Sequence, residues 1–256
     1  MKNQKKYYIG VYIMLSYFSG ESIAKIGNKT VHLSDTADDD GLSKVESKTS
    51  EHFSLVPSKT GRTIWYITAP SGAGKSYLSK QIIQEYRKLH PKNQIYVFSS
   101  LETDPTLDTL KYIKRVKINK PEYLETEFTA QDFENSICLF DDVDCLSNKK
   151  ILKKTMDVLN SILQTGRHFN VSCIYTSHAS TSGHSSKIIL NESHVIVIFP
   201  SCAGGKMLKY ICDQYLGLSK TQIEKMKNTK SRWVAVVRKF PRAIVTQNEV
   251  SLLKDF

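Results

Sequence analysis

The chain has 256 residues, of which 40% are hydrophobic and 24% charged, a composition that is typical of a folded globular protein and excludes wholesale disorder. The five cysteines have no spacing typical of a zinc site, and this suits a reducing compartment such as the cytosol. Lys and Arg total 36 against 25 Asp and Glu, a net charge of +11, which favours a polyanionic partner or reflects a generally lysine-rich composition.

The first 60 residues predict a small β-rich extension. Residues 7–18 are largely apolar and follow three lysines, which superficially matches a signal peptide. The stretch is shorter than the ~20 residues that span a bilayer, and a buried strand fits it equally well. A translation start at Met14 is a further alternative. Residues 22–33 alternate around Gly27-Asn28 and predict a hairpin, whereas 34–51 predict a mobile loop.

Residues 61–256 predict one α/β domain. Short apolar runs alternate with stretches of helical periodicity, which is typical of a mainly parallel sheet flanked by helices. The late segments 233–237 and 243–245 predict edge strands or a hairpin. The earlier strands are expected at 63–68, 94–99, 137–140, 171–175 and 195–199, with helices that include 75–90 and 149–164.

A Gly-rich turn joins the first of these strands to the first helix. Residues 69–76 have the spacing of a phosphate-binding loop (Walker A), although Ala69 replaces the usual first Gly. Backbone N–H groups of such a loop surround phosphates, Lys75 reaches the β- and γ-phosphates, and the Ser76 hydroxyl coordinates Mg²⁺. A turn without ligand is the alternative interpretation. The predicted contacts of ATP are Ala69, Pro70, Ser71, Gly72, Ala73, Gly74, Lys75, Ser76 and Tyr77.

The strand at 137–140 ends in two carboxylates, a Walker B pattern. If this strand end lies beside the 63–68 strand, Asp141 is placed to bind Mg²⁺, and Asp142 is placed as the general base for the attacking water. Many such ATPases have Glu at the second position. Asp144 is interpreted as a solvated or helix-capping residue. A plain helix N-cap after a core strand is the alternative for the pair.

Two further segments suggest residues that complete the site. Thr176 and Ser177 end the fourth strand, where polar groups can sense the γ-phosphate, and an ordinary capped loop is the alternative. Arg167 precedes that strand. It is a candidate for stabilising transferred phosphoryl charge across a subunit interface, or a cation near Gly166 at a helix C-terminus.

Together these motifs resemble the genome-packaging ATPases of large double-stranded DNA viruses and virophages, a poxvirus-like group within the FtsK–HerA superfamily. The resemblance covers about residues 60–245 and rests on the two Walker motifs, Gly166-Arg-His, Tyr175-Thr-Ser-His, Tyr215-Leu-Gly-Leu-Ser and Ser231-Arg-Trp-Val-Ala. It implies an additional-strand P-loop fold, ATP and Mg²⁺ as cofactors, and a pentameric or hexameric ring. It also implies sequence-nonspecific translocation of duplex DNA into a preformed capsid, contacts with capsid proteins, and action at the assembly site in the host cytoplasm or in the virion.

The sequence departs from the superfamily at two places. Ser177 or His178 stands where Gln is common at the end of the fourth strand, and no Arg occurs in residues 189–200, so the trans-acting arginine is open between Arg167, Arg232 and Arg238. The apolar N-terminus also allows membrane association. DNA contacts are expected in the loop 179–186 and among lysines that could equally be solvated helix faces: Lys206, Lys209, Lys220, Lys225, Lys227 and Lys230.

Two other functions fit parts of the pattern. A P-loop kinase for a nucleotide or small hydroxyl substrate would share the phosphate-binding loop, but it needs an Arg-rich lid that the sequence lacks. A nucleotide-gated scaffold that binds DNA or capsid and hydrolyses little would suit Asp142 in place of Glu.

Overall fold

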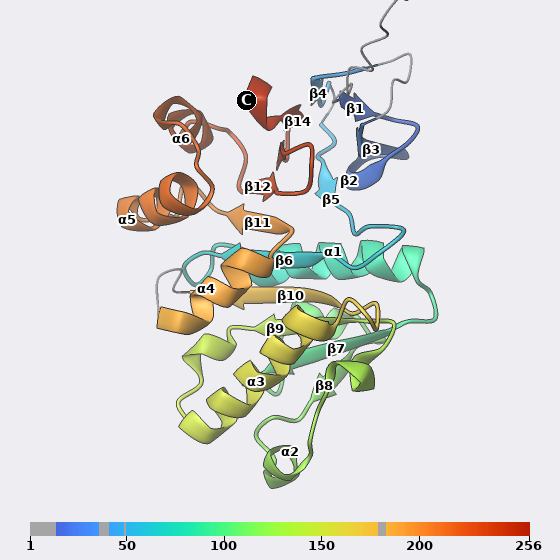
Figure 1. The fold of residues 1–256 in the computed structure, drawn as a ribbon, viewed down its shortest axis with the longest axis vertical. Helices are drawn as coiled ribbons and strands as arrows, with labels where there is room; N and C mark the ends of the chain where they lie inside the picture. The colour runs from blue at the N-terminus through green and yellow to red at the C-terminus, as the bar shows by residue number, and fades with distance from the viewer. Residues whose placement is uncertain (1–13, 36–40, 49, 179–182) are drawn as a thin grey trace, which may run out of the picture.

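The computed structural model describes residues 14–35, 41–48, 50–178 and 183–256 (Figure 1). The chain forms a ten-stranded sheet with helices on both faces and a separate four-stranded antiparallel sheet built near the N-terminus. Within these ranges no helix is long and apolar enough to cross a membrane. The predicted signal-like stretch and alternative start lie mostly in residues 1–13, outside the described residues; its end, Met14–Ser16, forms strand β1.

The strands and helices have the following bounds. The small sheet contains β1 (Met14–Ser16), β2 (Glu21–Ile26), β3 (Lys29–Ser34) and β5 (Ser54–Leu55). The large sheet contains β4 (Lys44–Glu46), β6 (Ile64–Thr68), β7 (Gln94–Ser99), β8 (Lys114–Val116), β9 (Ser136–Asp141), β10 (Ser172–Ser177), β11 (Val195–Ile198), β12 (Val234–Val237), β13 (Ala243–Thr246) and β14 (Glu249–Leu252). The helices are α1 (Lys75–Leu89), α2 (Pro121–Glu125), α3 (Lys149–Thr165), α4 (Gly183–Glu192), α5 (Gly205–Leu208) and α6 (Lys220–Lys227), with a π-helix η4 (Lys209–Tyr215) and the 3₁₀ turns η1 (Leu107–Thr109), η2 (Ala130–Phe133), η3 (Val143–Cys145) and η5 (Leu253–Asp255).

The large sheet has a parallel half and an antiparallel half, in the order β4-β14-β13-β12-β11-β6-β10-β9-β7-β8. From β11 to β8 neighbouring strands run parallel, and from β11 to β4 they run antiparallel. The expected adjacency of the 137–140 and 63–68 strands is wrong, because β10 lies between β6 and β9 and pairs with both. The late hairpin β12–β13 forms as expected, but its strands are not edge strands, because β14 and β4 lie beyond them in the sheet.

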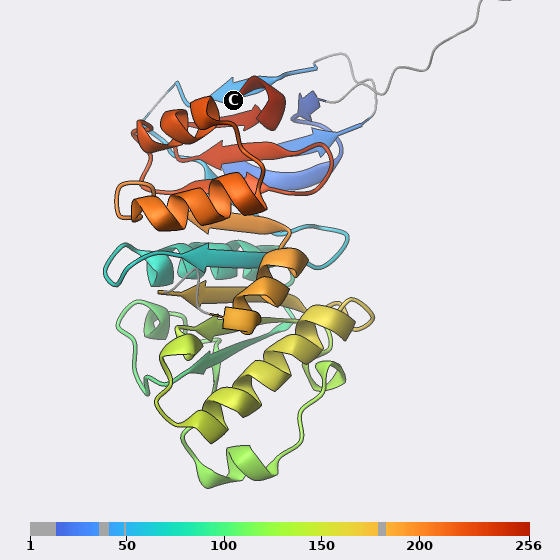
Figure 2. The same ribbon diagram turned by 60° about the vertical axis from the view of Figure 1, so that its left-hand side comes forward.

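Two hydrophobic clusters hold the layers together. Side chains of the parallel strands alternate between the faces, and every residue of β6 is buried. Trp65 and Ile67 belong to the cluster that includes α1 and the small sheet, whereas Ile64 and Tyr66 face the cluster with α3, α4, η4 and α6. Figures 1 and 2 show α1 behind the sheet, with α3 and α4 in front of it. This sandwich fixes the strand ends that carry the predicted site.

The N-terminal region forms the expected hairpin, with β2 and β3 joined at Gly27-Asn28. The loop expected over 34–51 is wrong for one segment, because Lys44–Glu46 forms β4 and pairs with β14. Val45 is buried between two charged neighbours, and Lys44 lies 3.0 Å from a carboxylate oxygen of Glu249. Three residues are too few to show the alternation of apolar and polar residues that predicts a strand. A division at residue 60 stays a prediction, and the large sheet takes strands from both sides of it.

Helix α3, which covers the front of the sheet, is capped at both ends by side chains. At its start the Asn148 side chain accepts hydrogen bonds from the amides of Lys150 and Ile151 (3.0 and 3.3 Å). At its end the guanidinium of Arg62, which comes from the segment before β6, donates to the carbonyl oxygens of Ile162 and Leu163 (2.7 and 2.8 Å). The positive charge also opposes the negative end of the helix dipole.

Replacing Arg62 by Ala should lower the free energy of unfolding by about 2 kcal/mol, because two charge-assisted hydrogen bonds are lost. Urea denaturation followed by circular dichroism measures this. Arg167→Ala, which removes an exposed arginine at the same helix end, should change stability by less than about 0.5 kcal/mol. Equal losses in the two variants would contradict the capping role of Arg62.

Candidate nucleotide-binding site

The loop between β6 and α1 has the backbone geometry of a phosphate cradle. Gly72 and Gly74 have φ of 75° and 113°, values that L side chains rarely adopt. Ala69 is fully buried and is not among the residues with positive φ, so the missing first Gly causes no strain. Helix α1 starts after Gly74 without a side-chain cap. Its first amides can therefore donate to an anion.

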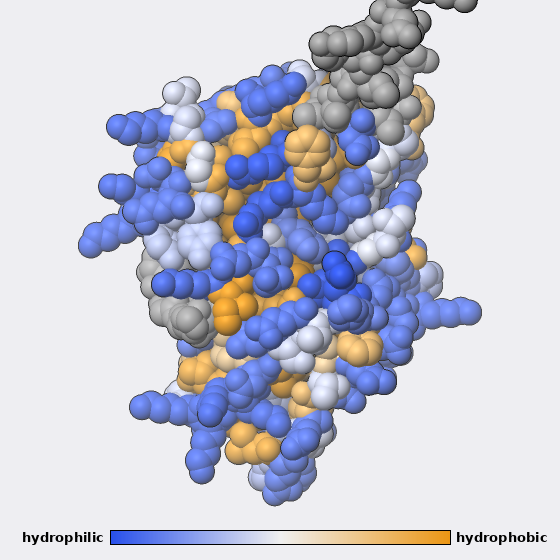
Figure 3. Space-filling model, in the orientation of Figure 1, coloured by the Kyte–Doolittle hydropathy of each residue, from blue (hydrophilic) through white to orange (hydrophobic). Residues whose placement is uncertain are grey.

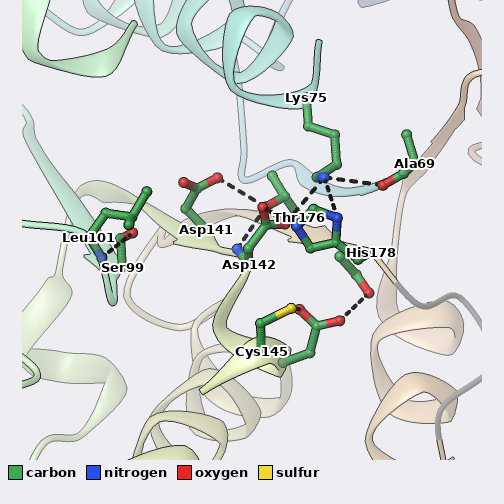
Figure 4. A network of polar contacts seen from close by, with 11 residues as sticks. Ala69, Lys75, Ser99, Leu101, Asp141, Asp142, Cys145, Thr176 and His178 are labelled. Atoms are coloured by element: carbon green, nitrogen blue, oxygen red, sulfur yellow. Dashed lines mark hydrogen bonds and ion pairs between the residues drawn. The ribbon is translucent and has the colours of Figure 1, made fainter. Parts of the chain in front are cut away.

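Lys75 is the first residue of α1, and its ammonium group lies in the middle of a polar network (Figure 4). Only 5% of Lys75 is exposed. Its Nζ donates to the carbonyl oxygen of Ala69 (3.1 Å) and lies 3.2 Å from Nδ1 of His178. It is also 3.5 Å from Oδ1 of Asp142. The expected lysine and the expected second carboxylate are thus in contact across the loop.

The two carboxylates at the end of β9 are joined by one hydroxyl group. Oγ1 of Thr176 lies 3.0 Å from Oδ1 of Asp141 and 3.0 Å from Oδ1 of Asp142, and it accepts the backbone N–H of Asp142 at 2.9 Å. Asp142 has a left-handed backbone (φ 48°), which turns its carboxylate back toward the loop. A hydroxyl has one proton to donate, so it serves one carboxylate at a time.

Burial shifts the protonation of the first carboxylate. Asp141 is 4% exposed, and the loss of hydration raises its pKa to about 6, with the charge of Asp142 as the next cause. The hydrogen bond from Thr176 and the charge of Lys75 act in the opposite direction. A divalent cation bound here would favour the ionised form, so Asp141 suits a metal ligand.

The end of β10 contributes two more contacts to the site. Nε2 of His178 lies 2.7 Å from Oδ2 of Asp142, and the hydroxyl of Ser177 donates to Oδ2 of Asp144 at 2.7 Å. Asp144, interpreted as a solvated or helix-capping residue, is partly exposed in the first turn of η3, and in addition it accepts this hydrogen bond from the end of β10. Thr176, Ser177 and His178 all reach the carboxylates, and their roles toward a nucleotide stay predictions.

The predicted arginines occupy three different places. Arg167 is exposed and precedes β10, at the opposite end of the parallel strands from the loop, so it does not reach Lys75 of its own chain. Arg62, and not Arg167, donates to the carbonyl groups at the C-terminal end of α3, which is the alternative position that the sequence suggests for Arg167. The guanidinium of Arg238 donates to carbonyl oxygens that include that of Ser193 (3.0 Å), after helix α4. Arg232 alone of the three candidates lies beside the loop.

The residues present fit MgATP. No group of three or more His, Cys, Asp or Glu side chains in the described ranges could hold a metal. Proteins usually bind Mg²⁺ through one or two carboxylates together with substrate phosphates, and the carboxylate of Asp141 and the hydroxyl of Ser76 are the groups that would hold it here. Ser76 is half-buried at the start of α1 and Tyr77 is 57% exposed next to it. The expected DNA-contact loop 179–186 begins in residues 179–182, outside the described residues, and ends in the first turn of α4.

Replacing Thr176 by Val should lower the free energy of unfolding by about 1–3 kcal/mol, because the backbone N–H of Asp142 loses its buried acceptor and the two carboxylates lose the one donor that they share. Urea denaturation at pH 7 measures the loss. Thr176→Ser, which keeps the hydroxyl, should be less destabilised than the Val variant. If Thr176→Ser loses as much free energy of unfolding as Thr176→Val, the methyl group of Thr176 and not its hydroxyl stabilises the fold.

The pKa of Asp141 also predicts a pH dependence. A carboxyl whose folded-state pKa is raised from 3.8 to about 6 stabilises the fold fully below pH ~4, and this contribution is lost as pH rises through about 6. Relative to Asp141→Asn, the wild type should therefore lose roughly 2–3 kcal/mol of unfolding free energy between pH 4 and 7. Urea titrations of both chains at each pH measure it, and parallel curves would refute the shift.

Comparison with known proteins places the fold and the family. No protein-family model matches the chain. An uncharacterized protein, V3 of Sputnik virophage, is 35% identical over 203 residues, which is 78% of this chain and 81% of that protein.

Among solved structures, the genome-packaging NTPase B204 of Sulfolobus turreted icosahedral virus 2 has a TM-score of 0.49 at 15% identity, over 73% of this chain and 98% of that one. The cytoplasmic domain of the type VII secretion ATPase EccC of Thermomonospora curvata has a TM-score of 0.50 at 10% identity, over 88% of this chain and 28% of that one. The expected virophage relationship and P-loop fold are confirmed. The chain belongs to the same family as Sputnik virophage protein V3, and its fold is that of an additional-strand P-loop ATPase.

Proposed function

We propose that the chain hydrolyses ATP at this site and uses the energy to move duplex DNA into a preformed viral capsid. The observation that carries the proposal is the contact of Lys75 with Asp142 at the phosphate-binding loop, beside the hydroxyl of Thr176 that joins Asp142 to Asp141. The virophage relative and the net charge of +11 support a viral protein with a polyanionic partner. The proposed place of action is the virus assembly site in the host cytoplasm.

The site residues have distinct proposed roles. The loop from Ala69 to Tyr77 would surround the phosphates, with Ser76 and Asp141 as ligands of Mg²⁺. MgATP would supply the phosphoryl group and the metal charge that offsets the charge of the leaving phosphates. Lys75, now held by Asp142 and the Ala69 carbonyl, would turn to the phosphates.

That movement would release the second carboxylate for proton transfer. Without Lys75, Asp142 keeps the contact with His178 through Oδ2 and the hydroxyl of Thr176 through Oδ1. The carboxylate stays oriented by these two partners and can accept a proton from water. Thr176 and Ser177 would report the state of the site to Asp144 and so to the loop after β9.

The proposed DNA surface lies on the α5–α6 side of the molecule, where hydrophilic side chains project in Figure 3. Lys225 and Lys227 are already paired, with Glu249 (4.0 Å) and Glu224 (2.6 Å). The exposed cations left for phosphate contacts are Lys206, Lys209, Lys220 and Lys230. A homo-oligomeric ring of five or six subunits, bound to capsid proteins, would bring these surfaces around the duplex. In such a ring Arg167 would act on the neighbouring subunit's site.

The test is ATP turnover by the purified protein with and without duplex DNA of several sequences. Turnover should depend on Lys75, rise with DNA of any sequence and fall with salt, because nonspecific contacts release counterions. Lys75→Ala removes the phosphate contact and serves as the blank. Asp142→Asn keeps the side-chain shape and should bind ATP but hydrolyse it at least about a hundredfold more slowly, as expected of a general base.

Three results would contradict the proposal in different ways. Turnover that depends on Lys75 but not on DNA would favour a kinase or an ATPase activated by another partner. ATP binding without turnover, even with DNA and assembled rings, would favour a scaffold. Normal hydrolysis by Asp142→Asn would remove Asp142 from the catalytic role.

A further inference from the structure

An arginine faces the phosphate-binding loop from the side opposite Lys75. A methyl group placed on Gly74 would lie 3.9 Å from Nε and 4.0 Å from Cζ of Arg232, and 3.7 Å from the ring of Phe199. Gly74 is the residue from which α1 starts. The guanidinium therefore lies beside the residue from which α1 starts, close to the first backbone N–H groups of the helix.

The backbone of Arg232 is fixed although its side chain is exposed. Its backbone N–H donates to Oε1 of Gln247 at 2.7 Å. The backbone N–H of Gln247 donates in turn to the buried hydroxyl of Ser231 at 2.9 Å. This network joins the start of β12 to the turn between β13 and β14. Because β12 runs antiparallel to β11, its first residues lie at the same sheet edge as the loop.

Among the residues that the structure describes, the guanidinium has no partner that would explain its position. In the described parts of the chain it forms no ion pair and no side-chain hydrogen bond. Lys75 contacts the β9 and β10 side of the loop, through Asp142 and His178. Arg232 comes from the β11 and β12 side. The loop amides between them are donors only, so a bound group rich in acceptors, such as a phosphate, suits the space between them.

We propose that Arg232 binds the phosphate chain of a nucleotide held by the loop of its own subunit, opposite Lys75. A guanidinium offers five N–H donors in a fixed plane, which suits two phosphate oxygens at once. The inference rests on the proposed nucleotide site. It assigns to Arg232 a role within the subunit, whereas the sequence motifs offered this residue as one of three candidates for action across a subunit interface.

The experiment compares nucleotide binding by wild type, Arg232→Ala, Arg232→Lys and Lys92→Ala. Lys92 is exposed in the turn after α1, so its variant loses the same charge away from the loop. A fluorescent ATP analogue with Mg²⁺ gives the affinity, and competition by inorganic tripolyphosphate tests the phosphate chain alone. Dilute protein is used, with sedimentation velocity to establish that it is monomeric, and thermal unfolding to establish that each variant is folded.

Arg232→Ala should weaken ATP and tripolyphosphate alike, by roughly tenfold or more, because a charge-assisted contact is lost. Lys should restore part of the affinity, and Lys92→Ala should bind like wild type. Normal binding by the Arg232→Ala monomer would overturn the inference and leave the nucleotide site intact. A loss for ATP without a loss for tripolyphosphate would overturn it in favour of a base or ribose contact. A wild type that binds no ATP would remove the proposed function as well.

Discussion

Two carboxylates at the end of one buried strand repel each other, and the site is organised around that repulsion. Asp141 and Asp142 are sequence neighbours, and the first of them is almost without solvent. Three groups hold them: the hydroxyl of Thr176, the ammonium of Lys75 and the imidazole of His178. None of these three residues belongs to β9, because Lys75 lies in α1, Thr176 in β10 and His178 just after β10. The arrangement exists only if β10 pairs with β9 on one side and with β6 on the other.

This constraint links the protonation of the site to its ligands. Lys75 shares its charge between the Ala69 carbonyl and Asp142, while burial favours a protonated Asp141. A magnesium–nucleotide complex would reverse both preferences, since it attracts the lysine and ionises the carboxyl. Binding of such a complex would therefore exchange one set of charge pairs around the carboxylates for another.

The sequence predicts the parts of the site that are local in the chain. A strand, a Gly-rich turn and a helix follow one another between residues 64 and 89, and Asp141 and Asp142 directly follow an apolar run. What it could not predict depends on strands that meet in space. The bond between Ser177 and Asp144, and the capping of α3 by Arg62 in place of Arg167, join residues far apart in the sequence. Strand β4 was missed because one buried Val45 gives no period.

The same strand has a consequence for how the molecule forms. Val45 pairs with Val250, so a strand from early in the chain forms the edge of the large sheet beside β14, the last strand in the sequence. Nearly the whole chain must be made before this pairing can occur. Contacts of such sequence separation slow folding. During synthesis the parallel half around β6 can assemble first, while β13 remains an open edge until β14 pairs with it and β4 in turn pairs with β14.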